Sequence, residues 1–169
     1  MTKLPHTIAV VNQLRENAYI GKHRHFSAAT RMAKLNVCFG LPAVIISVVL
    51  GSTFFVLISK EIPVEAKWAA AFAGPASAVL GWIKTFLNFK KAPESNRPIA
   101  NKYLEIQRDC EHRIAQYFDN LIDLKTLSQQ LSELNLRYHD VNKGAEGLRT
   151  HKRDYAFAMR MVDQLRTVC

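Results

Sequence analysis

The chain has 169 residues, enough for one domain or one assembly of helices. Its 23 Lys and Arg against 14 Asp and Glu give a formal charge of +9. Its three cysteines, Cys38, Cys110 and Cys169, are widely spaced and form no CxxC pair, which argues against a disulfide framework or a zinc site. The middle of the chain, residues 35–89, is apolar and both flanks are polar, so an average over the whole chain conceals its most distinctive feature.

The first flank predicts an amphipathic helix over residues 7–34. This segment has no proline, and Thr7 is a candidate N-cap. We expect a cytoplasmic helix that continues into the next segment and packs on the C-terminal region; binding to a membrane surface or a partner is the alternative. His23 and His25 are two residues apart, so they point in directions about 200° apart on a helix and predict no metal site. One helical face carries Ile8, Val11, Leu14, Ala18, Gly21 and His25.

Residues 35–59 contain no charged side chain. As a helix they would span about 37 Å, enough to cross a hydrocarbon core of about 30 Å. A soluble helix of this length normally keeps one polar face toward water, so we expect a transmembrane helix. Pro42 is expected to kink this helix or to mark a turn. Gly51, Ser52 and Thr53 are small and allow another helix to approach closely.

A short loop, residues 60–67, is predicted to return the chain as a hairpin, because Pro63 breaks the helix and the loop is too short for a domain. The second apolar segment, residues 68–89, is rich in small residues. Rows of small residues four apart predict tight contacts, within the hairpin or between subunits. The helix-packing candidates are Gly51, Ala70, Gly74, Ala78 and Gly81.

The charge distribution predicts the topology. Basic residues gather on both sides of the apolar region, whereas the loop at 60–67 is neutral, so the positive-inside rule places both termini in the cytoplasm. Because these cations flank apolar segments rather than interleave with aromatic residues on a soluble face, we expect contact with anionic headgroups and no direct nucleic-acid binding. The candidate headgroup contacts are Lys22, Arg24, Arg31, Lys34, Lys90 and Lys91.

The segment at 92–98, with two prolines, is expected to end the membrane region and break the helix. A long helix is then predicted, because apolar residues recur every seven positions from Tyr103 to Tyr138, with Asn120 and Asp123 on its outer faces. This stripe suits an intramolecular hairpin and subunit pairing equally well. Asn142–Gly144 predicts a turn before a last helix at 146–168. The expected fold is all-α: residues 1–34 a cytoplasmic helix, 35–89 a two-helix transmembrane hairpin and 90–169 a cytoplasmic, coiled-coil-like helical hairpin.

Catalytic motifs do not occur. The sequence contains no G-x-S-x-G, P-loop, dinucleotide-binding or H-E-x-x-H pattern. Its acidic residues are spaced as helical salt-bridge partners, for example Glu105 with Arg108 and Asp109 with Arg113. We therefore expect neither an enzyme nor a cofactor.

Several short motifs resemble the SLATT family when their order and spacing are taken together. They cover residues 25–114 and comprise HFSAA at 25–29, LPAVIIS at 41–47, GSTFF at 51–55, AVL at 78–80, TFL at 85–87 with Phe89, and Tyr103 at the start of a long helix. The resemblance implies a two-helix protein of the bacterial inner membrane, an effector in immune and conflict systems that oligomerises and perforates or depolarises that membrane. It also implies a separate sensor or nucleotide-signal-producing partner. One departure is Asn96-Arg97-Pro98, where a His-Arg pair is expected, so no role of that histidine carries over.

Two functions follow as hypotheses. The first is an oligomeric pore in membrane lipid, since one hairpin encloses no lumen. The second is a non-conducting membrane scaffold or sensor that docks a soluble partner. The candidate pore-lining residues are Ser47, Ser52, Thr53, Ser77, Lys84, Thr85 and Asn88.

Overall fold

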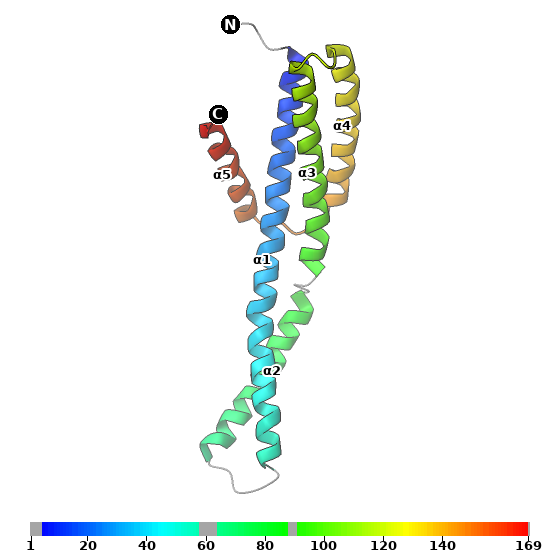
Figure 1. The fold of residues 1–169 in the computed structure, drawn as a ribbon. Coiled ribbons are helices and arrows are strands. Elements are labelled where there is room, and N and C mark those ends of the chain that lie inside the picture. Colours follow the sequence, from blue (N-terminus) through cyan, green and yellow to red (C-terminus); the bar gives the residue numbers. More distant parts are fainter. Residues whose placement is uncertain (1–4, 58–63, 88–90, 169) are drawn as a thin grey trace. The chain divides into compact units, whose positions relative to one another are not determined.

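The computed structural model describes residues 5–57, 64–87 and 91–168 (Figure 1). Within these ranges every regular element is helical and there is no strand, which confirms the predicted all-α class. The helices are α1 (His6–Leu57), α2 (Val64–Leu87), α3 (Lys91–Phe118), α4 (Leu124–Ala145) and α5 (Lys152–Val168).

The chain divides into two compact units. One, here called the helical bundle, joins Met1–Thr30 to Ala92–Cys169, and the other, the apolar unit, is Arg31–Lys91. The N-terminal flank and the C-terminal region therefore share one unit, although they were expected as separate regions of the sequence. Helix α1 contributes to both units, because its 52 residues cross the boundary after Thr30.

The core of the bundle is formed by α1, α3 and α4, whose bundle segments lie side by side (Figure 1). The apolar face predicted for the N-terminal helix is buried there, which confirms that this helix packs on the C-terminal region. Most of the heptad stripe also points into this core, except near the α3–α4 turn, where Leu124 is 40% exposed. Its buried positions therefore pair within the chain. The buried members are Ile8, Val11, Leu14 and Ala18 of α1, Ile99, Tyr103, Ile106 and Cys110 of α3, and Leu127, Leu134 and Val141 of α4.

The prediction of a single long helix beyond residue 99 is wrong, because the chain turns at residues 119–123. Asn120 has a positive φ of 59° and donates to the Tyr117 carbonyl, while Leu121 donates to the Gln116 carbonyl. These are the two bonds of a Schellman motif, which ends a helix with one left-handed residue. Asp123 then caps α4 by accepting from the Thr126 backbone N–H at 2.8 Å. The heptad spacing continues across the turn because both helices face the same core.

Three other boundaries differ from the predictions. Helix α3 begins at Lys91, so the segment at 92–98 is helical; Pro93 lies in the first turn, where the missing N–H would have no helical partner. Helix α4 runs through the expected turn at Asn142–Gly144, and the chain turns instead after Ala145, with Gly147 at a φ of 81°. At the start of α1 the Pro5 carbonyl accepts from Ile8 and Ala9, and Thr7 lies inside the helix.

In the apolar unit, α1 continues through Pro42 and α2 continues through Pro75. The prediction of a turn at Pro42 is therefore wrong. Residues 60–63 of the expected loop lie outside the described residues, and residues 64–67 begin α2. Among the described residues one helix, α1 over His6–Val48, is long and apolar enough to cross a membrane, and the corresponding apolar part of α2 is shorter, Gly74–Ile83. Only 6% of the most apolar window of α1 is buried, whereas the core helix of a soluble protein would be mostly buried.

Candidate functional site

The apolar unit exposes one stripe of large apolar side chains on each of its helices. On α1 the stripe repeats at three- and four-residue intervals through Val37, Leu41, Val44 and Val48, which are 57–65% exposed. On α2 the residues Trp68, Phe72, Val79 and Trp82 lie four, seven and three residues apart, so they share one face of the helix, and they are 55–70% exposed. A soluble surface normally scatters such residues singly, so two continuous stripes indicate a surface suited to lipid or to another apolar partner.

The hydroxyl groups that the structure describes in this unit, those of Ser47, Ser77 and Thr85, form hydrogen bonds with nearby groups. Ser47 Oγ donates to the Ala43 carbonyl at 2.8 Å and lies 3.0 Å from Ser77 Oγ, so the two serines link α1 to α2. Thr85 Oγ1 donates to the Gly81 carbonyl at 2.9 Å. Such bonds to the preceding turn let hydroxyl groups enter apolar surroundings at low cost. Of the other candidate pore-lining residues, the side chains of Ser52, Thr53 and Lys84, and the whole of Asn88, lie outside the described residues.

The small residues predicted to pack on α2 form two rows, Ala70, Gly74 and Ala78, and Ala73, Ser77 and Gly81. Ser77 of the second row meets Ser47 of α1, whereas the described glycines of the two rows are open. A Cβ built on Gly74 or Gly81 meets no described atom within 4 Å, and Ala78 is exposed. The side chain of Ala70 and the surroundings of Gly51 lie outside the description. Within the described part of the apolar unit, Gly74 and Gly81 therefore remain uncovered by α1.

Two of the candidate headgroup contacts, Lys22 and Arg24, make hydrogen bonds within the bundle. Lys22 Nζ donates to Gln107 Oε1 at 2.9 Å and lies 4.3 Å from the centre of the Tyr19 ring; burial lowers the pKa of Lys22, and the charge of Glu111 partly offsets that shift. Arg24 Nε donates to Thr150 Oγ1 at 2.8 Å, although Arg24 remains exposed. Arg31 is half-buried, Lys34 and Lys91 are exposed, and Lys90 lies outside the described residues.

A buried polar cluster lies in the bundle where α1 meets the start of α3. His25 is 4% exposed, its Nδ1–H donates to Asn96 Oδ1 at 2.7 Å, and its ring stacks on Tyr103 with centroids 5.7 Å apart. The Tyr103 hydroxyl donates to Asn142 Oδ1, which ties α3 to α4. Burial lowers the pKa of His25, with the Asn96 hydrogen bond opposing that shift, and raises the pKa of Tyr103 to about 12. The cluster is therefore neutral at pH 7 and holds three helices together.

Gly21 makes this arrangement possible. A Cβ at this position would lie 2.9 Å from the Tyr103 ring, closer than side-chain carbons approach one another. The glycine therefore lets α1 and α3 come together where Tyr103 crosses between them.

A second buried group fixes the start of α5. Asp154 is 1% exposed; its Oδ1 accepts from Ser27 Oγ at 2.9 Å and its Oδ2 accepts from the His151 backbone N–H at 2.8 Å. The same carboxylate thus binds α1 and closes the first turn of α5. Neither Asn96 nor Asp154 was among the predicted site residues. An acidic residue three positions after His151 is a local helix-start signal, but no local pattern predicts a contact between residues 127 apart.

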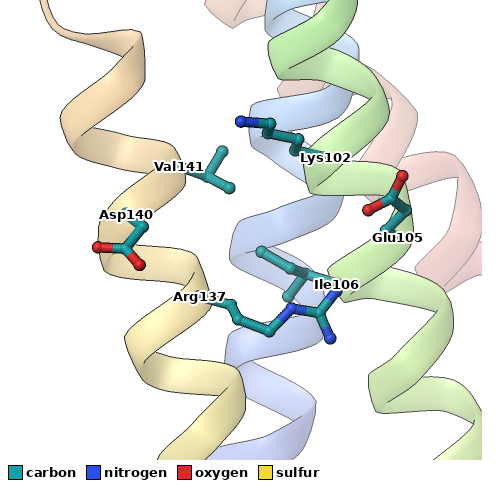
Figure 2. A pocket seen from close by; sticks show the side chains of 6 residues that line it. All are labelled: Lys102, Glu105, Ile106, Arg137, Asp140 and Val141. Carbon is teal, nitrogen blue, oxygen red and sulfur yellow. The ribbon is translucent and has the colours of Figure 1, made fainter.

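A shallow groove of about 210 Å³ lies between α3 and α4 (Figure 2). Its charged residues are two cations and two carboxylates, and Arg137 is ion-paired with Asp109, so the groove offers no surplus of charge to a ligand. The residues that line it are Lys102, Glu105, Ile106, Arg137, Asp140 and Val141. In the part of the chain that the structure describes, no group of three or more His, Cys, Asp or Glu side chains could hold a metal ion.

Comparison of the chain with known protein families, curated proteins and solved structures finds no match in any of the three. The resemblance to the SLATT family therefore stays a prediction from the sequence motifs.

Proposed function

We propose that the chain is an oligomeric, membrane-inserted effector that permeabilises or depolarises a bacterial inner membrane. The observation that carries this proposal is the pair of exposed apolar stripes on α1 and α2, together with the absence of charged residues from α1 between residues 35 and 57. Burying a single Val or Leu of such a stripe in hydrocarbon is worth about 1.5–3 kcal/mol, so two stripes strongly favour lipid over water.

Both helices are long enough for this role. The apolar part of α1 from residue 35 to 57 spans about 35 Å, and the 24 residues of α2 span about 36 Å. The apolar part of α2, Gly74–Ile83, is shorter than that of α1. We infer that α2 enters the bilayer beside α1, as the second arm of a hairpin. The contact between Ser47 Oγ and Ser77 Oγ supports this pairing, because a hydroxyl pair in hydrocarbon is better satisfied together than apart.

Assembly is the next step of the proposal. Two helices enclose no water-filled space, so permeability requires several copies around one axis. A Cβ at Gly74 or Gly81 would meet no described atom, so the surface at these two glycines is one on which a helix of another copy can pack closely. The immune role and a separate sensor protein come from the SLATT-like motifs alone.

Conductance through purified protein in liposomes is the direct test. We expect current or dye efflux from vesicles containing the wild-type chain. Gly74→Leu should reduce it about tenfold, because the larger side chain keeps the helix of another copy from packing at Gly74 and weakens assembly by about 1.4 kcal/mol or more. Ala76→Leu is the matched control because residue 76 lies about 200° around α2 from residue 74, so we expect a change of less than about twofold.

Two results would overturn the proposal. The first is wild-type protein that inserts into vesicles without conductance under any activating condition, which would favour the non-conducting scaffold. The second is a membrane potential that stays unchanged in cells whose growth the protein arrests.

A further inference from the structure

The turn between α4 and α5 is held against the end of the bundle from which the chain enters the apolar unit. Arg24 donates to Thr150, and Ser27 donates to Asp154, within six residues of the boundary at Thr30. On α3, Asn96 is bonded to His25 only four residues after the chain returns at Ala92. Residues 149–154 therefore belong to this end of the bundle, although they are more than 120 residues from Arg24 in sequence.

This attachment is rigid because the carboxylate that makes it is buried. Asp154 is 1% exposed and accepts hydrogen bonds from both α1 and its own helix start. Removing a buried charged acceptor leaves both donors without a partner, which costs more than an exposed contact would. The position of the turn is thus set by the fold.

The exposed charges at this end are mostly positive. Here the exposed cations Arg97, Lys143, Arg149, Lys152 and Arg153 outnumber the exposed carboxylates Glu94 and Glu146. At the opposite end of the bundle, the α3–α4 turn exposes Asp119, Asp123 and Lys125. The bundle is therefore polarised along its length.

The first half of α5 adds an aromatic side chain to this positive surface. Arg153, Phe157 and Arg160 are spaced by four and three residues, so they share one face of the helix. Phe157 is 38% exposed, and the other side of its ring faces His23 of α1, with the ring centroids 6.3 Å apart. An aromatic ring flanked by long cationic side chains suits the boundary between headgroups and acyl chains.

We propose that this basic end, consisting of residues 149–153 with Arg97 and the first turns of α5, docks on anionic phospholipid headgroups of the same membrane that the apolar unit enters. The inference rests on the proposed function, because only insertion of the apolar unit brings a bilayer to this end of the bundle. It extends the headgroup-contacting set from the residues adjacent to the apolar segments to a segment that only the fold brings there. Charge complementarity selects phosphatidylglycerol-like lipids over neutral ones.

Site-specific fluorescence quenching in reconstituted vesicles tests the proposal. The full-length chain carries Cys38→Ser and Cys169→Ser, with Cys110 left in place because it is buried and burial raises the pKa of its thiol to about 11. A fluorophore is attached at Ala156→Cys on the exposed face of α5, and the quencher is a lipid with a nitroxide on its headgroup. We expect quenching at 156 to be at least about threefold stronger in phosphatidylcholine vesicles with about 30% phosphatidylglycerol than in phosphatidylcholine alone, and to weaken in high salt.

Charge reversal provides the matched control. Lys152→Glu with Arg153→Glu should abolish the dependence on phosphatidylglycerol; both lie in the first turn of α5, where acidic residues favour the helix. The same reversal at the exposed Arg108 and Lys125 changes the net charge equally and should leave quenching at 156 unchanged. A label at Ser128→Cys, near the opposite end of the bundle, should remain unquenched.

A third label separates this inference from the proposed function. A fluorophore at Val44→Cys should be quenched by a nitroxide deep in the acyl chain if the apolar unit inserts. Absence of quenching at 44 would refute the proposed function and the inference with it. Quenching at 44 together with equal quenching at 156 in both vesicle types refutes the inference alone, and so does binding of a single-stranded oligonucleotide at the basic end in preference to the anionic vesicle.

Discussion

The helical bundle and the apolar unit are both helical, but they place their large apolar side chains in opposite ways. Ile8 and Val11 of the bundle are 0% exposed, whereas Val48 and Phe72 of the apolar unit are 65% and 70% exposed. The bundle alternates apolar and polar positions along each helix, so each helix has an inner and an outer face. In the apolar unit, α1 has no charged residue from 35 to 57 with which to make a polar outer face. The same secondary structure therefore carries two opposite distributions of large apolar side chains, buried in the bundle and exposed in the apolar unit.

The largest expected difference in the free energy of unfolding comes from shortening one large apolar side chain to alanine in each unit. Ile106→Ala removes a side chain that is 1% exposed, so the free energy of unfolding of the bundle should fall by about 2–5 kcal/mol. Val44→Ala, at a site that is 57% exposed, should change it by less than about 0.5 kcal/mol. Amide hydrogen exchange along α3 in detergent-solubilised full-length protein measures both. Equal effects of the two substitutions would contradict the comparison.

A pair of glycines gives the next largest contrast. In Gly21→Ala the new methyl group meets the Tyr103 ring, which cannot move away because it stacks on His25 and is bonded to Asn142. Overpacking of about 1–3 kcal/mol should exceed the helix-propensity gain of about 1 kcal/mol, so the bundle is destabilised. Gly81→Ala meets no described atom and should stabilise α2.

The melting temperature of the bundle and exchange protection of α2 report these two changes. A second variant checks the cause: adding Tyr103→Leu to Gly21→Ala should cost less than Tyr103→Leu costs in the wild-type chain. Additive effects of the two substitutions would show that the ring is not what Gly21 accommodates.

The smallest expected effect is the dependence of the stability of the bundle on pH. Burial lowers the pKa of His25 below its ordinary value of 6.5; hydrogen bonding to Asn96 and the charge of Asp154 oppose the shift, and Arg24 adds to it. Since the unfolded chain takes up the proton first as pH falls, this contribution to stability is complete above about pH 6.5 and decreases below it. Burial and the charge of Lys22 lower the pKa of His23 too, which adds to the same trend.

Unfolding measured at about pH 7.5 and about pH 5.5 tests this sign. His25→Gln should reduce the loss on acidification, leaving the part due to His23. His112→Gln, at an exposed site on α3, is the control and should leave the loss unchanged. A bundle that becomes more stable on acidification would contradict the burial of a neutral imidazole.

The predictable parts of the fold are those with a local period. Ile8, Val11 and Leu14 repeat at helical spacing and are buried as that spacing predicts. The heptads predicted burial of Tyr103 and Leu127 but concealed the turn, because seven-residue spacing is the same whether the helix continues or folds back. Asn120 and Asp123 carried the signal for that turn, as a left-handed residue and an N-cap.

The parts that were not predicted depend on contacts between distant residues. Asn96 lies in a segment whose prolines suggested a break, yet Pro93 is tolerated in the first turn of α3 and leaves Asn96 on the inner face. Asp154 meets Ser27 only once α5 folds back, and no periodicity encodes that pairing. The positions of Ser47 and Ser77 opposite each other likewise depend on the register of two helices.

The discontinuity of the bundle sets an order of events on the ribosome. The segment that ends at Thr30 is made first, but its partners begin at Ala92, after the whole apolar unit has been translated. At typical synthesis rates the nascent chain needs on the order of ten seconds between these stages. Throughout this interval Ile8, Val11 and Leu14 lack the neighbours on α3 and α4 that later cover them, so the apolar face of α1 is the last part of the bundle core to be completed although it is made first.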